Sequence, residues 1–243
     1  MGLHGLFGQR LAGDLGRQRD YMVRHDLAGR GIRNPRVLEA MARVPRELFV
    51  PPELVFEAYA DRALPIAGGQ TISQPYMVAL MIERLELSGG ETVLEVGAGS
   101  GYAAAVLSRI CNWVVAIERI STLAEAAAGR LQGLGCANVE IHIGDGRAGY
   151  PAGAPYEGIL VSAAAAAPPP ALLAQLAAGG RLVIPIGTED GIQELVCFRR
   201  RVGGFVAEPG LACRFVPLVA GTADGEEEGS NKRGDPEASG PVP

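Results

Sequence analysis

The chain has 243 residues, of which 48% are hydrophobic and 20% are charged, so it can bury a substantial core, and one α/β domain is the simplest expectation. No apolar run reaches about 18 residues, which argues against a membrane-spanning segment. The net charge is −5, and residues 224 to 237 contribute −4 of it; the nearly neutral remainder argues against nucleic acid as the main partner.

The ends of the chain and its rarer residues add further expectations. The first ten residues lack the basic start and apolar middle of a signal peptide, so we expect a cytoplasmic protein. The cysteines at positions 111, 136, 197 and 213 are too far apart for a C-x-x-C pair, and we expect reduced, buried thiols. The three histidines form no metal-ligand grouping, so no metal is expected.

The N-terminal third predicts helices and one unusual loop. Residues 9 to 30 predict a charged helix, and Pro35 fits the first turn of a second helix, in which apolar residues recur at helical spacing. Residues 61 to 76, D-R-A-L-P-I-A-G-G-Q-T-I-S-Q-P-Y, are neither periodic nor plainly solvent-like. A polar, glycine-bearing loop of this length is typical of a functional segment. A helix resumes after Pro75.

From residue 92 onward, short apolar strands alternate with helices, as a parallel sheet requires. We expect parallel strands at 92–96, 113–117, 139–143, 158–162 and 181–185. The helices between them are expected at 102–110, 121–134 and 170–178. Later, antiparallel strands are expected at 193–199, 204–211 and 213–219.

The fold class is therefore α/β, with a Rossmann-like sheet, an N-terminal helical cap and antiparallel C-terminal strands. We expect residues 1–88, with the unusual loop, and the α/β core, residues 89–220, to form one compact domain. Gly, Glu, Asp, Ser and Pro dominate from residue 221, which predicts a disordered acidic tail over 221–243.

The first strand of this core ends in a glycine-rich turn, T-V-L-E-V-G-A-G-S-G-Y, residues 92 to 102. Gly97, Gly99 and Gly101 allow positive φ and should bring bare N–H groups against a ligand at the start of the next helix. The spacing G-x-G-x-G differs from the dinucleotide fingerprint G-x-G-x-x-G. Glu95, two residues before the first glycine, would repel a pyrophosphate and suits a cationic ligand such as the sulfonium of S-adenosylmethionine.

Acids at the ends of successive strands favour an adenosyl ligand. Glu118 follows Gly97 by 21 residues, close to the roughly 20 expected for an acid that accepts from ribose hydroxyls. Asp145 is placed to accept from an adenine amino group, and Gly146 lets the backbone approach the ring. NAD remains possible on these grounds, although the glycine spacing and Glu95 count against it.

Seven segments closely resemble the protein-L-isoaspartate O-methyltransferase family, in the family's order, over about residues 15 to 220. They are R-E-L-F-V-P (46–51), A-Y-A-D-R-A-L-P-I (58–66), G-Q-T-I-S-Q-P-Y (69–76), V-L-E-V-G-A-G-S-G-Y-A-A-A-V-L (93–107), I-E-R (117–119), G-D-G (144–146) and R-F-V-P-L (214–218). Q-T-I-S-Q-P is highly specific, whereas many methyltransferases share the glycine loop.

The resemblance implies methyl transfer from S-adenosyl-L-methionine to the α-carboxylate of an L-isoaspartyl residue, or the side-chain carboxylate of a D-aspartyl residue. The ester then collapses to a succinimide, whose hydrolysis returns some normal aspartate. By the same resemblance Ser73 is the active-site serine, and Gln70, Thr71 and Ile72 are expected to bind substrate. The expected partners are damaged polypeptides, not nucleic acid or membrane, and we expect a monomer.

Some features depart from the family pattern or leave other functions open. Glu157 stands where the family usually has aspartate, Ser162 stands where it has threonine, and the Ala-Pro run at 163 to 170 is degenerate. A relative that methylates aspartate in a dedicated biosynthetic peptide would share all these motifs. A binding module that has lost catalysis is the alternative from another class, which the intact Ser73 and acids oppose.

Overall fold

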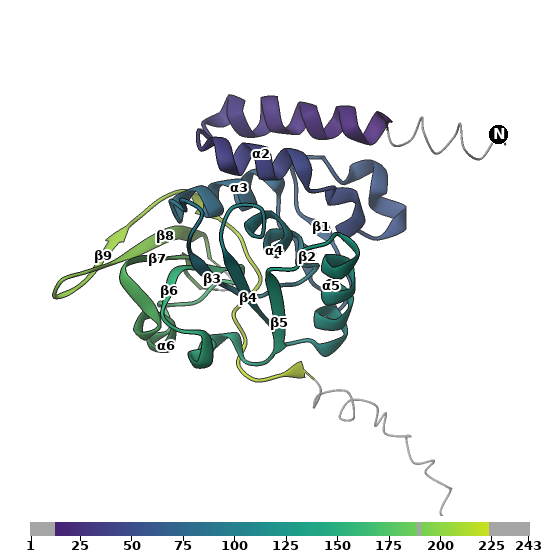
Figure 1. Ribbon diagram of the computed structural model, residues 1–243. Helices are drawn as coiled ribbons and strands as arrows, with labels where there is room; N and C mark the ends of the chain where they lie inside the picture. Colours follow the sequence, from purple (N-terminus) through teal and green to yellow (C-terminus); the bar gives the residue numbers. More distant parts are fainter. Residues whose placement is uncertain (1–12, 189–190, 224–243) are drawn as a thin grey trace, which may run out of the picture.

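The computed structural model describes residues 13–188 and 191–223, and a twisted sheet of eight strands forms its centre (Figure 1). Five parallel strands are ordered β7–β6–β3–β4–β5, with bounds Leu176–Ile186, Tyr156–Val161, Thr92–Val96, Trp113–Glu118 and Val139–Ile143. On the other side of β7, β8 (Gln193–Arg201) runs antiparallel and pairs with both β9 (Gly204–Glu208) and β10 (Ala212–Cys213). The predicted fold class is confirmed.

The central strands are apolar runs because both faces of the sheet are covered. Val93 and Val114 belong to one buried cluster, whereas their neighbours Leu94 and Val115 belong to a second cluster on the opposite face. The first cluster includes residues of α3 (Pro75–Arg84), α4 (Tyr102–Leu107) and α5 (Ser121–Gly133), and the second includes Leu172 of α6 (Pro170–Ala174). Successive side chains point to opposite faces of a strand, so the alternation gives the sheet two cores.

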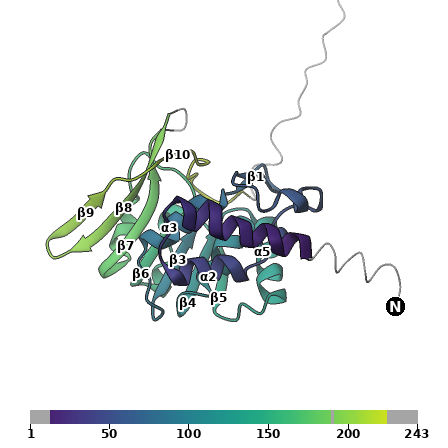
Figure 2. The same ribbon diagram turned by 90° about the horizontal axis from the view of Figure 1, so that it is seen from above.

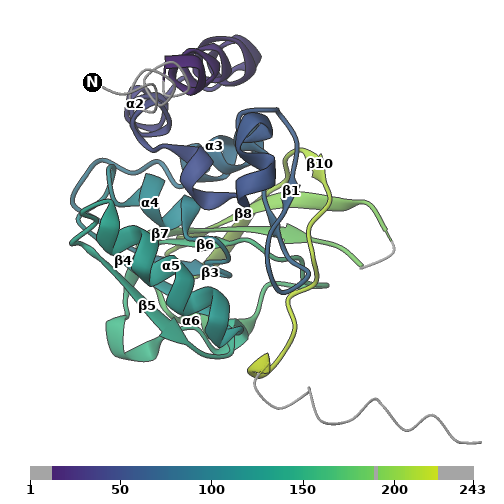
Figure 3. The same cartoon turned by 90° about the vertical axis from the view of Figure 1, so that its right-hand side faces the viewer.

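The N-terminal cap lies across the helices of the first face (Figures 1 and 3). Residues 13–30 are helical throughout, but the helix widens to a π-helix over Met22–Leu27 and tightens to a 3₁₀ turn over Ala28–Arg30. It ends at Gly31, which has a left-handed φ of 107°. α2 (Pro35–Arg43) then begins as expected, with the Asn34 side chain accepting from the first turn.

Two non-helical segments lie over the carboxyl edge of the sheet. The loop at 61–76 contains a two-stranded antiparallel hairpin, β1 (Leu64–Pro65) and β2 (Thr71–Ile72), which the sequence did not predict. Short 3₁₀ helices at Arg46–Phe49 and Pro52–Glu57 lead into it. Beyond β10, residues 214–223 form an extended strap that crosses the same edge of the sheet (Figures 1 and 2).

Several predicted elements have other bounds in the structure. α6 ends at Ala174 rather than at 178, and β7 already begins at Leu176. The expected strand at 213–219 is reduced to β10 and one isolated bridge between Ala164 and Pro217. The acidic residues 224–243 of the predicted tail lie outside the described residues.

Other expectations concern cysteines, metals and membranes. All four cysteines are free thiols, and only Cys213 is not fully buried. Among residues 13–188 and 191–223, no group of acidic, histidine or cysteine side chains could hold a metal ion. Within these ranges no helix is long and apolar enough to cross a membrane.

Candidate active site

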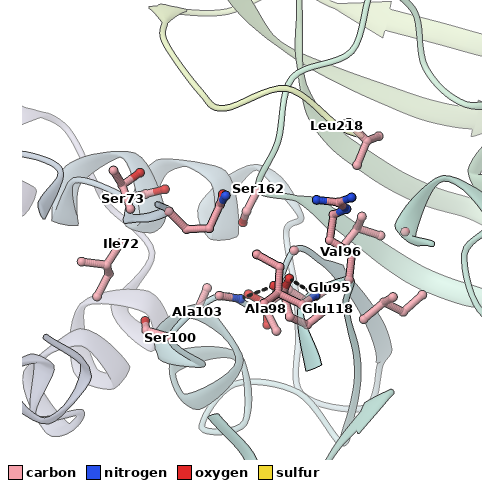
Figure 4. A pocket seen from close by; sticks show the side chains of 18 of the residues that line it. Ile72, Ser73, Glu95, Val96, Ala98, Ser100, Ala103, Glu118, Ser162 and Leu218 are labelled. Atoms are coloured by element: carbon pink, nitrogen blue, oxygen red, sulfur yellow. Dashed lines mark hydrogen bonds between the residues drawn. The ribbon is translucent and has the colours of Figure 1, made fainter. Parts of the chain in front are cut away.

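A cavity lies where β3, β4 and β6 end, beneath the β1–β2 hairpin (Figure 4). Its floor is the glycine turn together with Glu95 and Glu118. Its walls come from the hairpin loop: Gln70, Thr71, Ile72 and Ser73. The strap closes it with Pro217, Leu218 and Val219. The hairpin is held over the floor by apolar contacts, because Ile66 and Gly68 approach Gly99 and Ile120. The structure therefore brings together the loop and the glycine turn that the sequence marked separately.

The glycine turn has the predicted backbone, but its amide groups are already used. Gly97, Gly99 and Gly101 have φ values of 84°, 54° and 88°, which strain any other residue. Their N–H groups donate within the protein, at 2.8–2.9 Å, to the Ile117 carbonyl, the Glu118 carboxylate and the Ala98 carbonyl. The expectation that bare N–H groups of these glycines face a ligand is therefore wrong.

The floor acids supply negative charge instead. The Glu95 side chain is almost fully buried, and its Oε2 atom has no hydrogen-bond partner in the described structure. Burial, and then repulsion from Glu118, raise the pKa of the Glu95 carboxyl well above its usual value. An unpaired carboxylate lining a cavity is stabilised by an incoming cation, so this site favours a positively charged ligand.

Glu118 is held in a fixed orientation at the end of β4. Its Oε2 accepts from the N–H of Gly99 at 2.8 Å, and its Oε1 accepts from the N–H of Ile120 at 3.0 Å. A carboxylate can accept about four hydrogen bonds, so both oxygens keep capacity for further donors. The backbone orients the group, and its remaining lone pairs suit the hydroxyls of a ribose.

Two predicted cofactor residues do not line the cavity. Gly101 lies under α5, where an added Cβ would come within 3.1 Å of the Ala127 Cβ, so its small size serves helix packing. The Asp145 carboxylate instead accepts from Arg147 N at 2.8 Å and from Gly221 N of the strap at 3.0 Å. Its neighbour Gly146 does line the cavity, and an added Cβ there would clash with Val96 at 2.4 Å.

Ser73 is anchored through its backbone by a buried arginine. Arg46 is fully buried; its Nε donates to the Ala58 carbonyl at 2.7 Å, and one terminal nitrogen donates to the Ser73 carbonyl at 2.9 Å. The guanidinium also lies 4.8 Å from the ring centre of Tyr102, a cavity residue whose pKa is raised to about 12, mainly by burial. Arg46 therefore connects the cap, the serine loop and the start of α4.

A second cleft, the outer cleft, lies beside the cavity and meets it at Ser73. Besides uncharged polar and apolar residues, its lining includes two cations, Arg30 and Arg214, and no carboxylate. Arg30 is paired with Asp61 and stacked on Tyr76, whereas none of the hydrogen bonds or ion pairs found among the described residues involves the Arg214 side chain. The remaining lining residues are Ala63, Thr71, Ser73, Gln74, Met77, Ser162, Leu211, Ala212, Cys213 and Phe215.

Only three residues line both spaces, Thr71, Ser73 and Ser162, and all three carry hydroxyl groups. The inner cavity has Glu95 and Glu118 at its floor and Arg119 beside them. The outer cleft has Arg214 and the Asp61-paired Arg30, so the carboxylates lie on one side of the junction and Arg214 on the other. A cationic ligand in the cavity and an anionic group entering from the cleft would meet beside these hydroxyls.

The residues present fit S-adenosylmethionine, because the buried, unpaired Glu95 oxygen and the oriented Glu118 carboxylate lie on one cavity floor. Together with the sheet order, this site defines a class I, Rossmann-like S-adenosylmethionine-dependent methyltransferase. The family model described as protein-L-isoaspartate(D-aspartate) O-methyltransferase matches residues 17–223. The chain belongs to this family.

Individual relatives of the chain support this family assignment. A protein-L-isoaspartate O-methyltransferase 1 of Rhodopseudomonas palustris is 49% identical over 226 residues, covering 93% of this chain and 90% of the relative. One of Methylorubrum populi is 55% identical over 200 residues, covering 82% and 94%. A solved protein-L-isoaspartate O-methyltransferase matches with TM-score 0.74 and 31% identity, covering 83% of this chain and 66% of that longer chain.

A solved Plasmodium falciparum structure extends the agreement to the cofactor. That putative family member, in complex with S-adenosyl-L-homocysteine, matches with TM-score 0.72 and 25% identity, covering 83% of this chain and 98% of that one.

From the sequence, Ser162 and the segment at 214–218 stand out only in comparison with the family, and neither is predicted to lie at the site. Ser162 follows the last residue of β6, so the rule that ligands bind at the carboxyl ends of parallel strands could have identified it. Pro217 and Leu218 belong to the family-like segment R-F-V-P-L, but no local pattern placed the strap at the cavity, since its position depends on pairing with Ala164, more than fifty positions earlier.

Proposed function

We propose that this chain methylates the free carboxylate of L-isoaspartyl residues, or the side-chain carboxylate of D-aspartyl residues, in damaged polypeptides. The observation that carries the proposal is the junction at Ser73, where a cavity with Glu95 and Glu118 at its floor meets a cleft that Arg214 lines. The family membership supports the same reaction, and the resulting ester would lead to repair through a succinimide.

The proposed division of roles follows the geometry. Glu95 would favour the cationic end of S-adenosylmethionine, Glu118 would accept from its ribose, and Gly97, Gly99 and Gly146 would leave room for it. We retain Asp145 and Gly101 as supports of this site, one holding the strap and the other the packing of α4 on α5. Gln70, Thr71 and Ile72 line the cavity, and of the three Thr71 also lines the outer cleft; we retain all three as substrate-binding residues.

The reaction needs no strong base, because a carboxylate is already ionised at neutral pH. When bound, S-adenosylmethionine supplies the methyl group: the carboxylate oxygen bonds to its carbon while the carbon–sulfur bond breaks, the electron pair stays on sulfur, and no proton moves. The task of the protein is then mainly to align the carboxylate. We assign that task to the Ser73 hydroxyl, which would donate to the carboxylate and form no covalent bond.

We also propose that residues 1–88 and 89–220 act as one domain, since one buried cluster includes Met22 of the cap and Leu160 of the sheet. The monomeric state, the cytoplasmic location and the absence of nucleic-acid or membrane partners stay predictions. The acidic tail has no proposed role.

The experiment that tests the function is transfer of radiolabelled methyl from S-adenosylmethionine to a short isoaspartyl peptide, beside the same peptide with normal aspartate. We expect label in the isoaspartyl peptide only. Label in neither peptide, with cofactor binding confirmed, would contradict general repair and direct attention to a dedicated substrate peptide or a binding role.

A further inference from the structure

Ser162 lies on the sheet side of the junction, opposite the hairpin loop that carries Ser73 (Figure 4). It directly follows β6, and its N–H donates to the Val96 carbonyl at 2.9 Å. Two residues later, two backbone hydrogen bonds fix Ala164 to the strap. The Ala164 N–H donates to the Val216 carbonyl at 2.8 Å, and the Leu218 N–H donates to the Ala164 carbonyl at 2.7 Å. The backbone under Ser162 is therefore rigidly placed.

The hydroxyl of Ser162 makes no hydrogen bond to any residue of the described structure, although the residue is only partly exposed and lines both spaces. The Ser162 Cβ lies near Gly97, since a Cβ added on that glycine would be 3.7 Å from it, an ordinary van der Waals contact. Alanine at position 162 would keep the same Cβ. The hydroxyl itself is thus unexplained by packing or by internal hydrogen bonding.

We propose that Ser162 is a second catalytic hydroxyl, which donates a hydrogen bond to the substrate carboxylate from the sheet side while Ser73 donates from the cap side. The inference rests on the proposed function. A carboxylate held by one donor can still rotate about that contact, whereas two donors from opposite walls fix the plane of its oxygens. The lone pair of the attacking oxygen then points toward the methyl group in the cavity.

The two hydroxyls position the carboxylate more than they stabilise the transition state. Negative charge on the carboxylate decreases as the new oxygen–carbon bond forms, so hydrogen bonds to it weaken along the reaction. Very strong donors would slow the transfer, and neutral hydroxyls are suited because they orient the group while leaving it nucleophilic. The absence of any cation among the residues that line both spaces agrees with this.

The test measures methylation of the isoaspartyl peptide by Ser162→Ala and by the near-isosteric pair Ser162→Thr and Ser162→Val. We expect Ser162→Ala to lower kcat/KM by about 10- to 100-fold, the size of effect that loss of alignment produces. Ser162→Thr should keep most of the activity and Ser162→Val should be as slow as Ser162→Ala. Affinity for S-adenosylhomocysteine should be unchanged in all three.

The threonine–valine pair decides the question even if the alanine variant folds poorly, since the two side chains differ only in the hydroxyl. Equal rates for the pair, or a Ser162→Ala variant as fast as the parent, would overturn the inference while leaving the proposed function intact. If the parent itself does not methylate the peptide, the proposed function fails instead. Combining Ser73→Ala with Ser162→Ala should cost less than the product of the single losses, because both hydroxyls hold one carboxylate.

Discussion

Replacing Arg46 by methionine should destabilise the protein and slow methyl transfer together. The guanidinium is fully buried and donates to the Ala58 and Ser73 carbonyls, while its third nitrogen, Nη1, has no partner in the described structure. Hydrogen bonds from a charged donor contribute about 1.5–3 kcal/mol each. Methionine also removes the cost of burying a cation, so we expect a net loss of about 2–4 kcal/mol in the free energy of unfolding.

The assay is urea unfolding combined with peptide methylation, with Arg43→Met as the matched control. Arg43 lies on the surface of α2 and pairs with Glu39 at 2.6 Å, an interaction worth about 0.3–0.5 kcal/mol. We expect Arg46→Met to lower Tm by roughly 5–15 °C. Its kcat should fall more than its cofactor affinity, because Arg46 is a positioning residue for the Ser73 loop. An Arg46→Met variant that resembles Arg43→Met in both assays would refute this reasoning.

Three further changes test the site. Glu118→Ala should weaken S-adenosylmethionine binding by roughly 1.5–3 kcal/mol in calorimetry, and unchanged affinity would remove this acid from the ribose site. Burial raises the pKa of the Glu95 carboxyl above 4.5, so its ionisation destabilises the ligand-free fold as pH rises through that raised pKa. In thermal unfolding, Glu95→Gln should therefore be more stable than the parent at about pH 8, with the difference vanishing as pH falls toward 4.5; a pH-independent difference would contradict this. Arg214→Glu should lower kcat/KM for isoaspartyl peptides with acidic neighbours and raise it for those with basic neighbours, each by the equivalent of about 0.2–1 kcal/mol in activation free energy. Equal changes for both peptides would exclude contact between Arg214 and the substrate.

The inner strands of the core could be predicted because they are continuous buried apolar runs, and the half-buried edge strand β5 because its apolar residues alternate with polar ones. β3 and β5 have the predicted bounds, and β4 differs only by including Glu118. The prediction that α6 extends to residue 178 is wrong for a physical reason. An added Cβ on Gly180 would lie only 3.0 Å from the Tyr156 carbonyl, so this glycine permits close approach of β7 to β6. A glycine that ends a helix and one that admits a neighbouring backbone look alike in sequence.

The sequence could predict the acids of the site only from their positions at the ends of strands. Glu95 and Glu118 share the cavity floor, because neighbouring parallel strands end at the same edge. Asp145 follows the next strand, β5, yet its carboxylate caps the 3₁₀ turn after it and accepts from the N–H of Gly221, a partner 76 positions away. Nothing local to G-D-G distinguishes a carboxylate that meets a ligand from one that holds the strap.

The site is thus divided between two parts of the chain that different forces hold. The cofactor floor belongs to the sheet, where backbone hydrogen bonds and two cores fix Glu95 and Glu118. Ser73 belongs to the hairpin loop, which a single buried cation and a few apolar contacts hold over that floor. Because methyl transfer to a carboxylate depends on alignment rather than on a strong base, its rate is set by how accurately the cap is placed on the sheet. Changes that loosen this packing should therefore reduce catalysis before they reduce cofactor binding.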